Sequence, residues 1–222
     1  QRILNATKGQ EAAYQALITE KQKTAGEIRA ELFTLRGSAP IPFAEAYRYA
    51  LDASKVTGVR PALILGVIAQ ESNLGENVGQ CLLTNEPHKG DGRGVNTGRY
   101  FRGVMKPNRD VDPFLAITSE LGINPYGQVV SCPPGYGYGG AMGPAQFIPS
   151  TWACFGGFVQ SASGKCNPIN GSYAGPWEYA PSKDRIRQLL GKNSPGNPWE
   201  NQDAFMASAL LLKDNGASRG TY

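Results

Sequence analysis

The sequence predicts a mainly α-helical domain with a small irregular or β insertion, preceded by one long N-terminal helix. Three observations lead to this fold class. Residues 1–36 contain no proline and are rich in alanine, glutamate, lysine and glutamine, which favour helices. Residues 62–74 are apolar on nearly every side, as expected of a helix that runs through a core. Residues 76–112 carry frequent glycines and turn residues, which predicts irregular structure with at most a short hairpin.

The N-terminal helix is expected to stand apart from the globular domain. Its apolar residues form a narrow stripe that the polar stretch 19–26 interrupts, so it has no broad face to complete a core. We interpret residues 1–37 as a helical extension, either a solvated spacer or a coiled coil that associates with itself or with a partner. Gly37 and Pro40 end this helix, and residues 40–222 form the predicted domain.

The helices of the domain follow from apolar periodicity and from residues that start and stop helices. Phe43 to Thr57 has one apolar face, and Pro61 suits the first turn of the apolar helix that follows. Later helices are expected from Pro113 to Leu121, Pro144 to Phe155, Ser182 to Leu190 and Trp199 to Asn215.

Charge and composition narrow the possible functions. Twenty-two lysines and arginines against 18 aspartates and glutamates give a net charge of +4. This charge is mild and no basic stripe with interleaved aromatic residues is present, so nucleic acid is not an expected partner. No segment is long and apolar enough to predict an integral membrane helix. A single histidine and the lack of a CxxC pair argue against a metal site, and we expect no cofactor.

Four cysteines predict two disulfides and an oxidising compartment. Cys154 and Cys166 would close a short loop that has little core of its own. Cys81 and Cys132 would tie the loop after the apolar helix to the loop before Ala141. Of the three possible connectivities, this one needs the fewest crossings. Because no signal-like run is present, we expect a targeting segment outside this sequence and a secreted or cell-envelope protein.

Glu71 is the leading candidate for a catalytic residue. It lies four residues after Val67 and seven after Ile64, so it continues their apolar face one turn beyond the buried stripe. A carboxylate there is partly desolvated, which raises its pKa and lets it hold a proton near neutrality, as a general acid must. The alternative interpretation is an ordinary surface glutamate.

The other carboxylates near the candidate segments do not form a recognisable pair with Glu71. Glu76, Asp91, Asp110 and Asp112 lie in expected loops, and Asp110 and Asp112 read as turn and capping residues. Most glycosidases use two carboxylates. The sequence therefore favours chemistry that depends on one acid.

A glycine-rich turn at residues 139–152, GGAMGPAQFIPSTW, is expected to run directly into a helix. Glycines allow the backbone to approach a ligand closely, although a tight turn with no further role is the alternative. Met142, Phe147 and Trp152 are residue types found more often in a core than at a ligand, and Trp152 is assigned to the core. Tyr136 and Tyr138, in the loop just before the turn, could stack on a sugar ring or be structural.

Together, ALILGVIAQESNLG at 62–75 and GGAMGPAQFIPSTW at 139–152 resemble the lytic transglycosylases of the lysozyme-like superfamily, which cleave peptidoglycan. The resemblance covers about residues 43–220. It implies a lysozyme-like α+β fold, Glu71 as the single catalytic residue and peptidoglycan glycan strands as the partner. It further implies that the substrate is bound by Ser72, Tyr138, Met142, Gly143, Gln146 and Phe147.

In that family the N-acetyl group and 6-hydroxyl of the substrate replace a second carboxylate. The resemblance thus implies cleavage of the β-1,4 bond between N-acetylmuramic acid and N-acetylglucosamine, with a 1,6-anhydro product. A hydrolytic muramidase and a non-catalytic wall-binding or scaffold module are the alternatives. Gly137 stands where many relatives have a serine that contacts the acid. Relatives also carry a tyrosine motif after the last helix, so we expect the natural sequence to continue beyond Tyr222.

Overall fold

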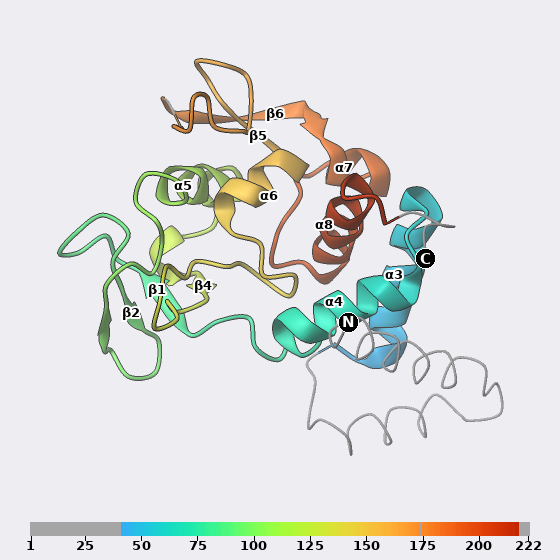
Figure 1. Ribbon diagram of the computed structural model, residues 1–222, viewed down its shortest axis with the longest axis horizontal. Helices are drawn as coiled ribbons and strands as arrows, with labels where there is room; N and C mark the ends of the chain where they lie inside the picture. Colours follow the sequence, from blue (N-terminus) through green and yellow to red (C-terminus); the bar gives the residue numbers. More distant parts are fainter. Residues whose placement is uncertain (1–40, 174, 218–222) are drawn as a thin grey trace. The chain divides into compact units, whose positions relative to one another are not determined.

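The computed structural model describes residues 41–173 and 175–217, which form two compact units (Figure 1). Residues 41–77 and 205–217 belong to the first unit, and residues 78–204 form the second. Helices and short antiparallel strands are both present, so the chain has a mixed α+β structure dominated by helix. The expected N-terminal helix and the expected continuation after Tyr222 lie outside the described residues.

Helix α3 (Phe43–Thr57) of the first unit begins and ends at the predicted residues. Its last turn is closed by Gly58, whose amide donates to the Ser54 carbonyl oxygen at 2.8 Å. Helix α8 (Asn201–Asp214) is two residues shorter at its start and one shorter at its end than predicted. The rings of Tyr49 in α3 and Phe205 in α8 pack with their centroids 5.7 Å apart.

Helix α4 (Pro61–Ser72) carries a proline in its first turn, as the sequence predicts, but ends two residues early. The cause is the backbone of Asn73 and Leu74, which turns into the left-handed region with φ values of 52° and 55°. The Leu74 carbonyl oxygen then accepts a hydrogen bond from the Ile41 amide at 3.3 Å. This bond ties the end of α4 to the residue that precedes α3 by two positions.

A four-stranded antiparallel sheet with the order β3-β2-β1-β4 organises the first part of the second unit. Its strands are β1 (Cys81–Leu83), β2 (Gly92–Gly94), β3 (Tyr100–Phe101) and β4 (Val129–Val130). This is more strand than the single hairpin expected. Strands of two or three residues are too short to show a recognisable alternation in the sequence. A disulfide joins Cys81 of β1 to Cys132, which follows β4, with the predicted pairing.

Two predicted helices of the second unit have different starting points in the structure. Helix α5 (Val111–Glu120) begins two residues before Pro113, and the 3-10 helix η1 (Pro125–Gly127) follows it. Helix α6 (Pro149–Phe155) begins five residues later than predicted. Residues 142–147 form a tight turn instead, in which the Met142 amide donates to the Phe147 carbonyl oxygen at 2.9 Å.

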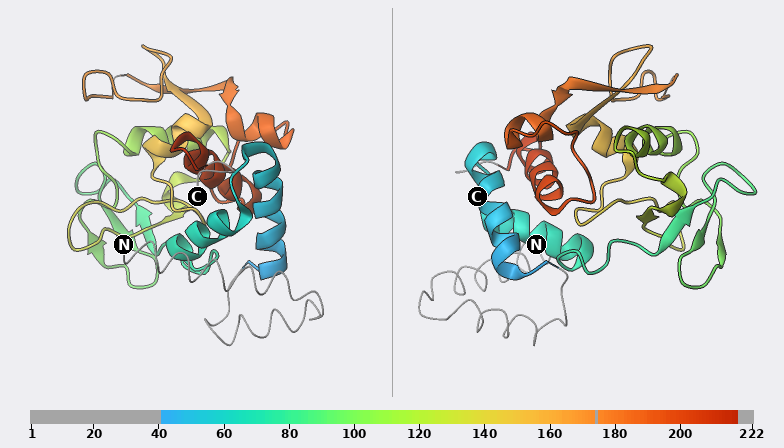
Figure 2. Two further views of the ribbon diagram at one scale, coloured as in Figure 1. Left: turned by 45° about the vertical axis from the view of Figure 1, so that its right-hand side comes forward. Right: turned by 180° about the vertical axis from the view of Figure 1, so that it is seen from behind.

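The sequence did not predict the two-stranded sheet formed by β5 (Gly156–Gln160) and β6 (Trp177–Asp184). Figures 1 and 2 show the two strands side by side. The long connection between them follows β5, which itself follows α6 directly. The helix expected from Ser182 is therefore wrong over its first three residues. Helix α7 (Arg185–Leu190) starts only after Asp184, whose carboxylate accepts a hydrogen bond from the Arg187 amide at 2.8 Å.

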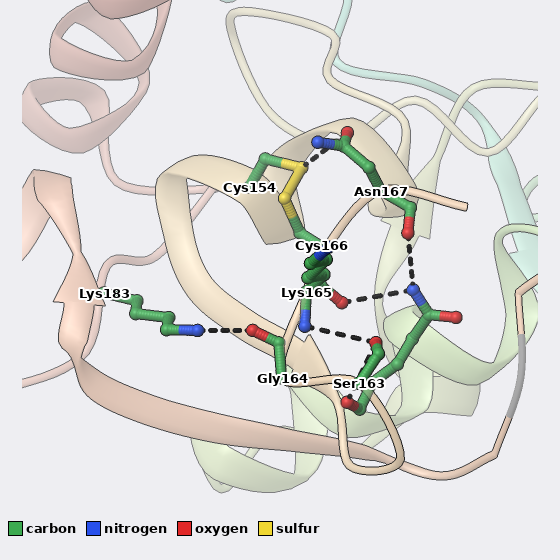
Figure 3. Close-up of a disulfide and its surroundings, with 8 residues drawn as sticks. Cys154, Ser163, Gly164, Lys165, Cys166, Asn167 and Lys183 are labelled. Carbon is green, nitrogen blue, oxygen red and sulfur yellow. Dashed lines mark hydrogen bonds between the residues drawn. A yellow bond between two sulfur atoms is a disulfide. The ribbon is translucent and has the colours of Figure 1, made fainter. Parts of the chain in front are cut away.

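The second disulfide, Cys154–Cys166, joins the end of α6 to the connection between β5 and β6 (Figure 3). This pairing also agrees with the prediction. Lys183 of β6 donates to the Gly164 carbonyl oxygen, which fastens the loop from the other side. This segment, expected to have little core of its own, contributes the buried side chains of Phe158 and Val159 in β5.

The buried carboxylate of Asp110 joins the starts of α5 and α6. Its Oδ1 accepts hydrogen bonds from the Ser150 amide at 3.3 Å and hydroxyl at 2.7 Å, and its Oδ2 binds the Arg109 guanidinium at 2.7–2.8 Å. Amides in the first turn of a helix have no partner within the helix and favour negative charge. Asp110 therefore does act as a capping residue, but the helix that it caps is α6.

Replacing Asp110 with asparagine is expected to lower the free energy of unfolding by about 1–3 kcal/mol, because the side-chain amide leaves the buried Arg109 contact without an acceptor. Urea denaturation measures this loss. Asp112→Asn is the matched control, since Asp112 forms an exposed ion pair with Lys89 that contributes about 0–1 kcal/mol. Equal losses in the two variants would contradict the role given to Asp110.

Candidate active site

Glu71 lies in the last turn of α4, and its side chain is exposed. Among the described residues, none forms a hydrogen bond or ion pair with its carboxylate. Desolvation by the surrounding protein raises the pKa of Glu71 above the ordinary glutamate value, as the sequence predicts. Its position at the C-terminal end of a helix acts in the same direction, because the partial negative charge there disfavours an anion.

One other described carboxylate has a raised pKa, and it differs from Glu71 in burial and pairing. Burial raises the pKa of Asp203, and hydrogen bonds from Lys192 and the Asn197 amide only partly offset that effect. The Asp203 carboxylate is fully buried and pairs with the Lys192 ammonium at 2.7 Å. It is therefore a structural charge, whereas Glu71 combines a raised pKa with access to solvent.

The backbone directly after Glu71 is strained. Asn73 and Leu74 are both in the left-handed region, which asparagine tolerates but leucine rarely adopts. Conformations of this kind cost on the order of 1–3 kcal/mol each and occur disproportionately at functional sites. The buried Ser72 hydroxyl holds the turn by donating to the Ile68 carbonyl oxygen at 3.3 Å and accepting from the Gly75 amide at 2.8 Å. The structure thus shows Ser72 supporting the end of α4, and its contact with substrate stays a prediction.

The second candidate segment is the tight turn from Met142 to Phe147, which belongs to the second unit. The Gly143 carbonyl oxygen accepts from the Gln146 amide at 3.1 Å and from the Gln146 Nε2 at 2.8 Å. Gln146 is itself left-handed, with φ of 51°. Its half-buried side chain is therefore fixed, and its Oε1 has no partner among the described residues. An oriented carbonyl oxygen of this kind can accept a hydrogen bond from the N–H of an N-acetyl group.

Two further residues of this turn have buried side chains. Met142 is fully buried, and the Phe147 ring packs edge-on against Trp152 and Phe155 at centroid distances of 5.8 and 5.6 Å. Trp152 lies in the core, as expected. Phe147 thus anchors α6, which agrees with its expected structural role. Direct contact of Met142 or Phe147 with a sugar stays a prediction that their burial does not support.

The carboxylates considered as partners for Glu71 all have structural hydrogen bonds or ion pairs. Asp110 binds Ser150 and Arg109, as described above, Asp112 pairs with Lys89, and Glu76 accepts from the Asn73 side chain. Burial alone would raise the pKa of Asp91, but hydrogen bonds from Tyr100, the Gly103 amide and His88 outweigh burial and lower it. Asp91 and Asp110 are therefore held by the fold, whereas Glu76 and Asp112 are exposed and have one partner each. The fixed state of the two buried carboxylates is consistent with chemistry that uses one acid.

Sequence reasoning missed the group formed by Asp91, Tyr100 and Gly103. The Asp91 carboxylate accepts from the Tyr100 hydroxyl at 2.7 Å and from the Gly103 amide at 2.8 Å. These residues come together through β2 and β3, which are too short to be recognised from the sequence. Tyr100 and Gly103, three residues apart, were the available signals, but neither has a distinctive spacing.

Two hollows of the second unit contain none of the expected substrate-binding residues. The larger, of about 430 Å³, is lined by Pro181, Ser182, Arg187, Gln188, Gly191 and Lys192. The smaller, of about 200 Å³, lies at the Cys154–Cys166 disulfide. Among the described helices, none has the length and apolar character needed to cross a membrane. Comparisons with protein-family models, curated proteins and solved structures found no match to this chain.

Gly143→Ala is expected to destabilise the second unit strongly. Gly143 has φ of 61°, and a Cβ there would lie 1.8 Å from the Pro198 carbonyl oxygen. Gly98→Ala is the matched control, because Gly98 has φ of 62° and nothing within 4 Å of its Cβ position. The control should lose only the left-handed cost of about 1–2 kcal/mol. Thermal and urea unfolding test this difference, and equal losses would show that the turn does not pack against Pro198.

Proposed function

We propose that this protein is a peptidoglycan lytic transglycosylase with a lysozyme-like fold, in which Glu71 acts as the single general acid and base. The observation that carries the proposal is the state of the Glu71 carboxyl group. It is exposed, has no partner among the described residues, and has a pKa raised by desolvation. A carboxyl group with these properties can both release and recover a proton during one catalytic cycle.

The proposed reaction breaks the glycosidic bond between C1 of N-acetylmuramic acid and the 4-oxygen of N-acetylglucosamine. Glu71 donates its proton to that oxygen as the bond breaks and positive charge develops at C1. The resulting carboxylate then takes the proton from the 6-hydroxyl of the muramic acid, whose oxygen forms the new bond to C1. The products are a free 4-hydroxyl and a 1,6-anhydro ring, and Glu71 returns to its protonated form.

Several features outside Glu71 support the proposal. The Asp91 and Asp110 carboxylates are buried and accept hydrogen bonds from several donors, so neither is available as a nucleophile. The Gln146 Oε1 is held as an acceptor in a rigid turn, which suits an N-acetylated sugar. A net charge of +4 fits a partner with negative charge, and two disulfides are compatible with an extracytoplasmic location.

Glu71→Gln is expected to reduce glycan cleavage by about 10²–10⁴-fold, because the amide keeps the shape of the side chain but cannot transfer the proton. The assay is digestion of purified sacculi followed by mass spectrometry of the soluble products. Wild-type protein should release fragments with 1,6-anhydro ends. Fragments with added water would instead identify a muramidase, and intact strands with retained binding would identify a wall-binding module.

Glu76→Gln is the matched control, because Glu76 lies five residues away in the same unit and its amide variant still accepts from Asn73. Its activity should stay near that of wild type, and near-normal cleavage by Glu71→Gln would remove Glu71 from its role. Stability gives a second readout. Between the ordinary and the raised pKa of Glu71, the folded state holds the proton more tightly than the unfolded state, so wild-type stability falls as pH rises. As pH rises across that window, the melting temperature of Glu71→Gln should therefore increase relative to that of the wild type.

A further inference from the structure

Two exposed tyrosines of the second unit are attached to the same turn. The side chains of Tyr100 and Tyr138 are 45% and 47% exposed. Tyr100 is fixed through its hydroxyl, which donates to Oδ2 of Asp91 at 2.7 Å. The other oxygen of Asp91 accepts from the Gly103 amide at 2.8 Å, and Asp91 as a whole residue is 3% exposed. The buried Asp91 thus links the position of the Tyr100 ring to the Gly103 turn.

Tyr138, in the loop that precedes the tight turn at residues 142–147, lies against the Gly103 turn. Gly103 is left-handed with φ of 70°, and a Cβ on it would lie 3.0 and 3.2 Å from Cδ1 and Cε1 of the Tyr138 ring. The ring therefore rests directly on the glycine. The Gly139 amide also donates to the Gly103 carbonyl oxygen at 3.4 Å, which keeps the two segments together. Tyr100 is thus fixed by a side-chain hydrogen bond, and the Tyr138 ring is positioned by its contact with Gly103.

Exposed aromatic rings that are already fixed are suited to binding a sugar. A pyranose ring presents axial C–H groups on its face and hydroxyls around its edge, so its face can pack on the electron-rich face of an aromatic ring. Tyrosine provides such a surface with few side-chain torsions to immobilise, and anchoring the ring lowers that cost further. Tyr138 also directly precedes the turn of residues 139–147, to which the proposed function assigns substrate binding.

We propose that Tyr100 and Tyr138 form a stacking platform for sugar rings of a β-1,4-linked, N-acetylated glycan, with Asp91 and Gly103 holding the platform in place. The choice of this glycan rests on the proposed function. The geometry of the platform does not depend on the proposed function, because every contact that defines the platform lies within the second unit.

The test uses Glu71→Gln as the parent, so that binding can be measured without cleavage. The probe is penta-N-acetylchitopentaose, and the measurement is isothermal titration calorimetry. Adding Tyr100→Ala or Tyr138→Ala should raise the Kd about three- to tenfold, the size expected for loss of one aromatic contact. Tyr126→Ala is the matched control, because Tyr126 is 50% exposed but lies outside the platform, and its Kd should not change.

Two conservative variants separate stacking from folding. Tyr138→Leu keeps an apolar side chain over Gly103 but removes the aromatic ring and its hydroxyl, so weaker binding with an unchanged melting temperature supports the platform. Tyr100→Phe keeps the ring without its bond to Asp91 and should weaken binding less than Tyr100→Ala. Unchanged Kd in the folded Tyr100 and Tyr138 variants, or no binding by the parent, would overturn the platform.

The sacculus assay distinguishes this failure from a failure of the proposed function. Release of anhydro products together with insensitivity of binding to both tyrosines would overturn the platform alone. Tyrosine-dependent binding without cleavage by the wild-type chain would overturn the transglycosylase and leave the platform standing.

Discussion

The desolvation of one carboxyl group is the constraint on which the proposed chemistry depends. Helix α4 is apolar along most of its length, and Glu71 occupies its last turn, where the exposed carboxyl group is partly desolvated and has no partner among the described residues. A nearby cation or a hydrogen-bond donor would lower the pKa and remove the proton that the reaction needs. The left-handed residues Asn73 and Leu74 end the helix immediately afterwards, and the Ser72 hydroxyl holds that ending in place.

The second unit uses its carboxylates in the opposite way. Asp91 and Asp110 are buried, and each binds several donors that come from different segments. Such bonds are costly to break, because a buried acceptor without donors has lost its water as well. These buried hydrogen bonds therefore fix the positions of segments that have little regular structure of their own. Asp91 holds the Gly103 turn in this way, and Asp110 holds the start of α6, which directly follows the tight turn at residues 142–147.

The sequence predicted best those features that depend on long periodic patterns. Helix α3 matched at both ends, and the raised pKa of Glu71 followed from its place on the apolar face of α4. Both disulfide pairings also agreed, but they were predicted from loop closure rather than from periodicity. The strands β1 to β4 were too short to show a period. The start of α6 was misplaced because the Gln146 backbone adopts a left-handed conformation, which a propensity argument does not anticipate.

The sequence could also name residues without showing how they are used. Ser72 and Met142 were expected at the substrate, and the structure places both side chains in buried positions. Asp110 was expected to cap the helix at Pro113, but its carboxylate makes no cap bond there and binds Ser150, 40 residues away, at the start of α6. Tyr100 and Asp91 were missed as a pair because their contact depends on strand pairing. Long-range hydrogen bonds of this kind follow from topology, which local sequence patterns do not specify.

The most direct test of the central claim is a titration of the Glu71 carboxyl group by ¹³C NMR, with Glu71→Gln used to assign its resonance. We expect a midpoint clearly above 4.5, the ordinary value for glutamate, because desolvation disfavours the charged form. A midpoint at or below 4.5 would contradict this expectation, since Glu71 would then be an ordinary surface carboxylate without the proton that the proposed reaction requires.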